Sequence, residues 1–320
     1  MAPWFASLAA AMCVALAPAA FAQAYPTKPV HVIVAFAPGG PVDVVARLVA
    51  NKLGDIIGQP VVVENRPSAT GNIATQVVAK AAADGYTVLA TSSAFAVNVS
   101  LSPNAGYDAE RDFAPVIQAA TQPNVLVVNA EFPAKTLAEL LEMAKTQKLA
   151  YASPGIGTTP HLTGEHLFRA IAKVDVTHVP FKGAGPAASA VVSGQPPIGS
   201  LAVTAPIPFI QSGRLRALAI SSGKRHPLLP SVPTFAELGY PEIEEYTWVG
   251  FFAPAGTPPA IVQKLNAGID EVLRMPDVRE RLEALTFEPI GGSSQQFSDY
   301  VRAEVVKWAE VVKVTGAKVD

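Results

Sequence analysis

Residues 31–53 read HVIVAFAPGGPVDVVARLVANKL, and this stretch decides the fold class. The apolar run over 31–36 predicts a buried strand. Apolar residues then recur with the period of a helix, at Val42, Val45, Ala46, Val49 and Leu53. Between strand and helix, Gly39 and Gly40 allow a positive φ and a close backbone approach, and Pro41 suits a first helical turn. A strand, a glycine turn and a helix in this order predict a βα unit of an open α/β sheet.

The same alternation continues along the chain. Further strands are expected over 61–64, 87–91, 124–128, 150–153, 177–180, 198–202, 216–220 and 248–253. About 300 residues are enough for two domains with separate cores. We therefore expect an α/β protein in which each domain is a mostly parallel sheet flanked by helices. Domain 1 would comprise 25–123 plus 246–320, domain 2 would comprise 124–245, and the ligand cleft would lie between them.

Residues 1–24 carry no Lys, Arg, Asp or Glu and end in the small-residue sequence Ala22-Gln23-Ala24. This pattern predicts a cleavable secretory signal, and hence a periplasmic protein. A membrane anchor is the weaker alternative, because Pro3 and Pro18 shorten the apolar run. A lipid anchor is disfavoured because Cys13 lies too early.

Composition excludes several classes of function. The net charge is −2 with a pI near 6.2, so there is no basic footprint for nucleic acid. The single cysteine lies in the predicted signal, so the exported chain needs no disulfide. No Gly-x-Ser-x-Gly elbow, zinc motif or phosphate loop occurs, so we expect no metal, no cofactor and no enzyme, with a periplasmic hydrolase as a distant alternative. The acidic pair Glu244 and Glu245 is expected on a solvated face.

Two glycine loops carry the candidate chemistry. The first is 36–43, in which Asp43 complements the helix dipole and can accept orphan N–H groups. The second is SPGIGTTPH over 153–161, where Thr158 or Thr159 can cap a helix. His161 either donates its Nε2–H to a ligand or holds the loop, and the structural role is favoured. Each loop alone equally suits a plain strand–helix connection. One loop in each domain, at the carboxyl ends of strands, favours an anion site in the cleft.

Motifs along the chain resemble the Bug-type substrate-binding receptors of tripartite tricarboxylate transporters. They include GGPVDVVAR over 39–47, VVVENRP over 61–67, DGYT over 84–87, HVPFKG over 178–183, GRLRAL over 213–218 and APAGTP over 253–258. The resemblance implies a two-domain Venus flytrap that closes over a small organic carboxylate. It also implies delivery of that solute, by a monomer, to an inner-membrane permease. A sensor kinase is an alternative partner that the sequence does not separate from a permease.

The resemblance also implies which residues meet the ligand. In such receptors two Gly-rich loops, the loop after the third strand and a segment near 181–185 face the cleft. Carried onto this chain, the expected ligand-binding residues are Phe36, Ala37, Gly39, Gly40, Val42, Asp43, Ser92, Ser93, Phe95, Ser153, Gly155, Gly157, Thr158, Thr159, His161, Gly183 and Ala184.

Two departures from the family pattern bear on specificity. Leu201 stands where the family commonly carries an Asp, and Phe95 stands where it often carries a His. A less polar cleft favours an aromatic or partly apolar mono- or dicarboxylate, stacked on Phe36, Phe95 or Trp248. For Trp248, packing in the core is the favoured alternative.

Overall fold

The computed structural model describes residues 25–68, 70–102 and 104–318, so the predicted signal lies outside the described residues. The strands are β1 (Val30–Val34), β2 (Val61–Asn65), β3 (Thr87–Ser92), β4 (Phe113–Asn129), β5 (Leu149–Ser153), β6 (Val176–Pro180), β7 (Ile198–Ala202), β8 (Leu215–Ile220), β9 (Tyr246–Pro254) and β10 (Glu288–Pro289). The helices are α1 (Pro41–Ile57), α2 (Asn72–Ala79), α3 (Ala94–Leu101), α4 (Leu137–Ala144), α5 (Thr159–Glu165), α6 (Ala184–Val192), α7 (Ile207–Gln211), α8 (Pro259–Arg274), α9 (Pro276–Ala284) and α10 (Ser294–Thr315). A π-helical turn, His166–Ile171, extends α5, and a 3-10 turn spans Ala236–Leu238.

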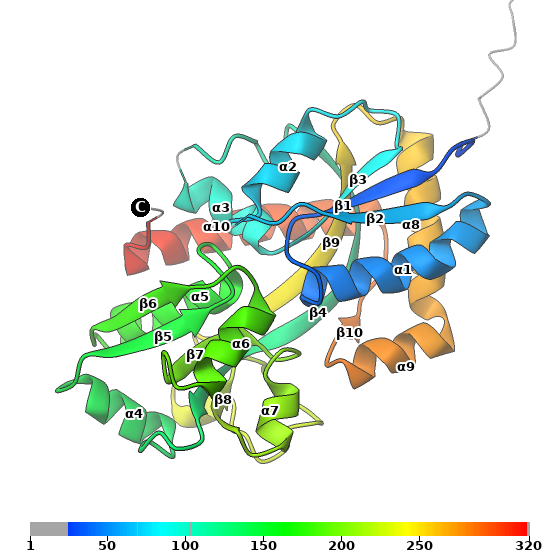
Figure 1. The fold of residues 1–320 in the computed structure, drawn as a ribbon. Helices are drawn as coiled ribbons and strands as arrows, with labels where there is room; N and C mark the ends of the chain where they lie inside the picture. Colours follow the sequence, from blue (N-terminus) through cyan, green and yellow to red (C-terminus); the bar gives the residue numbers. More distant parts are fainter. Residues whose placement is uncertain (1–24, 69, 103, 319–320) are drawn as a thin grey trace, which may run out of the picture.

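The strands form two lobes that share one long strand, β4 (Figure 1). In the first lobe the order is β2-β1-β3-β9-β4, with β10 also on β4. In the second lobe the far half of β4 pairs with β7 and β8, and β7 continues to β5 and β6. The pairs β1–β2, β1–β3, β5–β6 and β5–β7 are parallel, whereas β4 and β9 run antiparallel to their neighbours.

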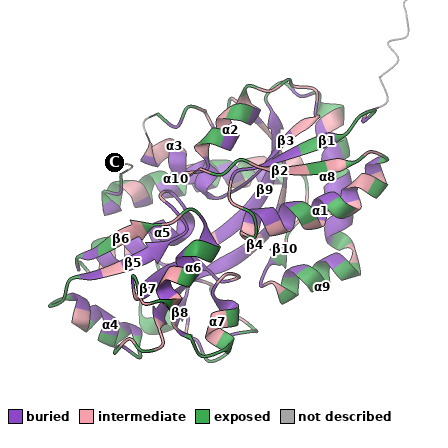
Figure 2. Ribbon diagram, in the orientation of Figure 1, coloured by how far each residue is buried: buried purple, intermediate pink, exposed green. Residues whose placement is uncertain are grey.

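Helices cover both faces of each sheet, and each face has its own core (Figure 2). In the first lobe, α1, α8 and α9 pack on one face and α2, α3 and α10 on the other. In the second lobe, α4 and the π-helical turn oppose α6 and α7. The expected fold class is therefore present: two α/β lobes in the arrangement of a Venus flytrap. Within the described residues, no helix combines the length and apolar character needed to cross a bilayer.

Strand β4 changes partners in the middle of its length. Pro123 is the last residue paired with β9, opposite Tyr246, and Asn124 is the first paired with β7, opposite Ala202. This change of partner supports crossings at 123/124 and 245/246, although the division into domains remains a prediction. The sequence predicted only 124–128 of this strand. The first half escaped notice because Pro115 and Pro123 interrupt its apolar pattern and its register with β9 shifts twice.

Candidate functional site between the two lobes

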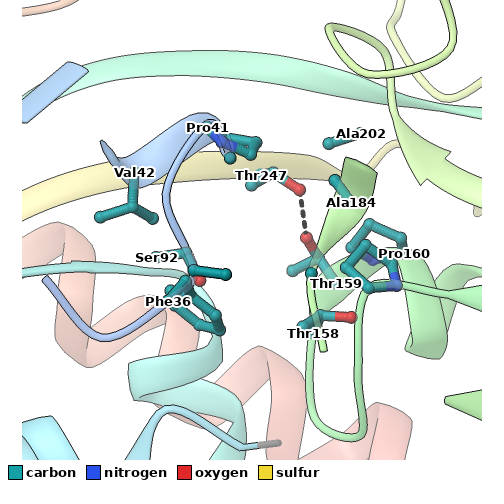
Figure 3. A pocket seen from close by; sticks show the side chains of 14 residues that line it. Phe36, Pro41, Val42, Ser92, Thr158, Thr159, Pro160, Ala184, Ala202 and Thr247 are labelled. Atoms are coloured by element: carbon teal, nitrogen blue, oxygen red, sulfur yellow. Dashed lines mark hydrogen bonds between the residues drawn. The ribbon is translucent and has the colours of Figure 1, made fainter. Parts of the chain in front are cut away.

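A pocket lies between the lobes and is lined from both of them (Figure 3). The first lobe contributes Phe36, Ala37, Gly40, Pro41, Val42, Ser92 and Thr247. The second lobe contributes Pro154, Thr158, Thr159, Pro160, Gly183, Ala184 and Ala202. No Lys, Arg, His, Asp or Glu occurs among these lining residues. The pocket is therefore apolar apart from hydroxyl groups and the backbone.

Three helices begin at this pocket: α1 after Gly40, α5 after Thr158 and α6 after Gly183. The first N–H groups of a helix have no partner inside the helix, and the peptide dipoles place a partial positive charge at that end. Pro41 and Pro160 occupy first turns, where their missing N–H is no loss. The remaining amides make the pocket suited to an anion, although no cationic side chain lines it.

Asp43 shapes the first loop from behind the pocket. Its Oδ2 accepts from the Gly39 N–H at 2.9 Å, and its Oδ1 accepts from Arg47 Nε at 2.9 Å and Asn65 Nδ2 at 2.8 Å. Burial acts to raise the pKa of this carboxyl, but the three hydrogen bonds outweigh burial and hold the pKa below its usual value. Asp43 is 3% exposed and does not line the pocket, so the structure gives it a positioning role.

The second loop is fixed by Thr158 and His161. Thr158 Oγ1 donates to the Gly155 carbonyl at 2.8 Å and accepts from the His161 N–H at 3.4 Å. The Gly157 N–H donates to His161 Nδ1 at 3.2 Å, and burial holds the pKa of His161 well below its usual value. His161 therefore holds the loop, which was the favoured alternative. Ser153, Gly155, Gly157 and His161 do not line this pocket.

A chain of hydroxyls crosses the base of the pocket. Thr247 Oγ1 donates to Asn124 Oδ1 at 2.8 Å, because an amide oxygen only accepts. Thr159 must then donate to Thr247 at 2.7 Å (dashed in Figure 3), and Ser93 donates to Thr159 at 3.2 Å. These protons are all committed, and Ser93 lies behind the pocket wall rather than in it.

Ser92 differs from the other hydroxyls of the pocket. It accepts from the Ala94 N–H at 3.3 Å, and no described residue accepts its proton. Its hydroxyl is therefore the side-chain donor left for a ligand, beside the amides of the helix ends.

Aromatic residues divide between the pocket and the core. Phe36 lines the pocket. Phe95 is buried in the first-lobe core, with ring centroids 4.3 Å from Phe252, and Trp248 donates from Nε1 to buried Glu304 at 2.9 Å. The expectation that Phe95 faces the ligand is wrong, whereas Trp248 packs in the core, which was the favoured alternative. Phe95 lies on α3, in which apolar and buried residues occur on several sides of the helix, so sequence spacing could not show which side faces the cleft.

Two further expectations need correction. Leu201 is buried in the second-lobe core, and the next residue, Ala202, lines the pocket, because neighbours on a strand point to opposite faces. Glu245 is 0% exposed and accepts from Thr163 Oγ1 and from His166 Nδ1 at 2.9 Å, so only Glu244 is on a solvated face. The sequence did contain a signal for the burial of Glu245, because Ile243, Glu245 and Thr247 alternate with exposed or half-buried neighbours.

The pocket lining also includes five residues that were not named among the expected ones: Pro41, Pro154, Pro160, Ala202 and Thr247. Thr247 lies on β9, one residue after the crossing between lobes, and no glycine or helix start marks it. Pro154 is part of the second glycine loop and could have been included on that ground.

The pocket has a volume of about 40 Å³, which is room for a few water molecules, because one water needs roughly 10–15 Å³ of such volume. Direct hydrogen bonds such as Ser93–Thr159 join the two lobes next to this pocket.

Two α/β lobes that share strand β4, with a pocket lined from both, define a solute-binding protein of the periplasmic type. Residues 45–317 match the family described as tripartite tricarboxylate transporter family receptor, and the chain belongs to that family.

Relatives across the family are similar over nearly the whole chain. Protein BugT of Bordetella pertussis is 40% identical over 301 residues, which is 93% of this chain and 92% of that protein. The structure of MatC from Rhodopseudomonas palustris with bound malate is 35% identical with a TM-score of 0.86, covering 90% of this chain and all of that one. The R. palustris protein Rpa4515 with adipate is 35% identical with a TM-score of 0.87, covering 92% and 100%.

Proposed function

We propose that this protein is exported to the periplasm, binds a small organic carboxylate between its lobes, and delivers it to the inner-membrane permease of a tripartite tricarboxylate transporter. The observation that carries the proposal is the convergence of three helix starts on a pocket without any charged side chain. The malate and adipate bound by two similar proteins support a carboxylate as the ligand class.

The energies are sufficient for such a receptor. A partly buried helix N-terminus stabilises an anion by up to about 2 kcal/mol. Each hydrogen bond to a charged group contributes about 1.5–3 kcal/mol. Micromolar affinity requires about 8 kcal/mol, which amides from two lobes together with Ser92 can supply. The amides of one lobe alone would contribute less than the binding free energy that micromolar affinity requires.

The pocket walls favour a ligand that is partly apolar. Phe36, Pro41 and Val42 line one side, and Pro154 and Pro160 line the other. We infer an aromatic or partly apolar mono- or dicarboxylate, whose carboxylate meets the helix ends and whose body packs against Phe36. A ligand with several charges would leave some of them without partners, since no cationic side chain lines the pocket.

Binding requires the lobes to separate and close again, because about 40 Å³ holds no organic acid. We infer that the hinge lies where β4 changes partners, at 123/124, and where the chain crosses back at 245/246. Closure then adds the amides of the second lobe to those of the first.

A thermal-shift screen against small carboxylates tests this proposal. The panel comprises citrate, C4 to C6 dicarboxylates, acidic amino acids, benzoate and the phthalate isomers. A ligand at 100 times its Kd that binds only the folded protein stabilises by about 2.7 kcal/mol. We expect stabilisation by at least one benzoate or apolar dicarboxylate. Tight binding of citrate without binding of any aromatic or apolar acid would contradict the inferred ligand class.

A further inference from the structure

A second cavity, of about 550 Å³, lies on the other side of the loop that joins β5 to α5. Ile156 of this loop lines the second cavity, whereas Pro154 and Thr158 line the interlobe pocket. The remaining walls are α5, the π-helical turn, the edge strand β6 and the chain that follows α10. Figure 1 shows the end of α10 reaching over the side of the second lobe where α5 and β6 lie. The cavity is thus lined by parts of both lobes.

His161 presents a buried hydrogen-bond donor to this cavity. Its Nδ1 accepts from the Gly157 N–H, so the neutral ring carries its proton on Nε2. The residue is 4% exposed, it lines the cavity, and no described residue accepts from Nε2. Its ring stacks on His178 with centroids 4.0 Å apart, and burial with nearby Arg169 lowers the pKa of His178 to about 4. A metal ion is disfavoured here, because Nδ1 is already engaged and Nε2 is protonated.

Arg169 is held at the cavity wall by buried partners. Tyr151 OH donates to Glu165 Oε1 at 2.8 Å, and Glu165 Oε2 forms an ion pair with Arg169, whose Nε lies 2.9 Å away. Both oxygens of Glu165, which is 3% exposed, are therefore engaged. The two terminal nitrogens of the Arg169 guanidinium have no partner among the described residues, so they remain available to a ligand.

Lys318 adds a second cation to the wall, and within the described residues no carboxylate forms an ion pair with it. Asp175, at the exposed rim, is the opposing charge. With Glu165 committed to Arg169, the donors that face the cavity are one imidazole N–H, one guanidinium and one ammonium group. This donor set fits the three or more acceptor oxygens of a tetrahedral oxyanion or the two of a carboxylate.

We propose that this cavity is a second, separate anion site, which binds a carboxylate, sulfate or phosphate group between His161 Nε2–H, Arg169 and Lys318. The site does not depend on the ligand of the interlobe pocket. Because Lys318 follows α10 of the first lobe and the other donors belong to the second, the bound anion bridges the lobes.

The test is NMR of the protein labelled with 15N at histidine and titrated with sodium sulfate, at constant ionic strength with chloride. The chain has five histidines, so the Nε2–H resonance of His161 can be assigned. The protein carries Gly40→Val, which blocks the interlobe pocket as a competing anion site. We expect a saturable shift of the His161 resonance. In the double variant R169Q/K318Q the sulfate affinity falls at least tenfold.

The matched control is Lys313→Gln, which removes one exposed positive charge near the end of the same helix, α10. It should leave the sulfate affinity within twofold. If the double variant folds poorly, a crystal of the unaltered protein soaked in selenate tests the site instead. We then expect anomalous density between His161 and Arg169. No saturable shift at His161, an unchanged affinity in R169Q/K318Q, or selenate only in the interlobe pocket would each overturn the proposal.

Discussion

Gly40 shows how one residue sets access to the helix end that faces the ligand. Its φ is −80°, so any residue fits the backbone, and a Cβ there would meet only the Ala37 carbonyl oxygen at 3.5 Å. Gly40→Val should therefore leave the fold intact while its methyl groups occupy the pocket. We expect ligand affinity to fall at least tenfold, about 1.4 kcal/mol, with an unchanged melting temperature of the ligand-free protein. Calorimetry and thermal unfolding measure the two quantities, and normal binding would remove the first loop from the site.

Glu245 is a buried carboxylate that accepts from Thr163 and His166 next to the crossing between lobes. Glu245→Gln removes the negative charge that strengthens both of these buried hydrogen bonds, and its amide NH₂ cannot accept from Thr163 or from a protonated His166 Nδ1. We expect the free energy of unfolding to fall by about 1–3 kcal/mol in chemical denaturation.

The control for this prediction is the neighbouring residue. Glu244 is exposed, so Glu244→Gln should change stability by less than about 0.5 kcal/mol. Equal effects of the two substitutions would contradict the buried role of Glu245.

At the residue scale, the sequence indicates which loops reach the pocket but not which side of each loop faces it. Phe36, Gly40 and Thr159 line the pocket, whereas Asp43 and His161 lie in the same loops and point away to hold them. A polar residue at a helix start can either bind a ligand or hold the loop by hydrogen bonds. The path of the backbone decides which of the two it does.

Helix α1 illustrates how an element is fixed at its start. Asp43 accepts the Gly39 N–H and the side chains of Arg47 and Asn65, which ties the loop before α1 to the helix and to β2. Because these bonds hold the pKa of Asp43 below its unfolded value, the carboxylate stabilises the fold at pH values above the unfolded pKa. That contribution is lost as pH falls below about 3.9, through the lower folded pKa.

Asp43→Asn should therefore lower the free energy of unfolding at pH 7, and the difference from wild type should shrink as pH falls below about 4. Urea unfolding at several pH values measures this. Asp55→Asn, at an exposed position of the same helix, is the control and should change little. A difference from wild type that is constant down to pH 2 would contradict the role assigned to the Asp43 carboxylate.

Elements with a regular apolar pattern could be predicted from the sequence. The strand that belongs to both lobes, β4, could be predicted only in part. Strand β7 spans Ile198–Ala202, as expected, because it is buried on both faces. Strand β4 was predicted at less than half its length, because its first part contains two prolines and its register with β9 shifts twice. Because β4 belongs to the sheets of both lobes, its sequence of apolar and polar residues does not follow the pattern of a strand in a single sheet.

At the scale of the whole molecule, Gly157 of the second lobe lies against Asn98 of α3 in the first. Gly157 has φ +76°, and a Cβ there would collide with the Asn98 side chain. Gly157→Ala should disfavour the closed arrangement and lower ligand affinity. Solution scattering at saturating ligand should then show less compaction than in the wild type.

The matched control is Gly58→Ala, which has φ +74° and no atom within 4 Å of the added Cβ. Both variants carry the strain of a left-handed alanine, about 1–3 kcal/mol, so their melting temperatures should fall by similar amounts. Only Gly157→Ala should lose affinity. Equal affinities in the two variants would show that this contact does not limit closure.

The central claim is that helix ends and backbone amides, without cationic side chains, hold the carboxylate of the ligand. Calorimetric titration of the protein with the best acid from the panel and with its primary amide tests this claim most directly. We predict that the acid binds at least a hundredfold more tightly, about 2.7 kcal/mol, because the helix ends favour a negative charge. Equal affinity for the acid and the amide would contradict the claim.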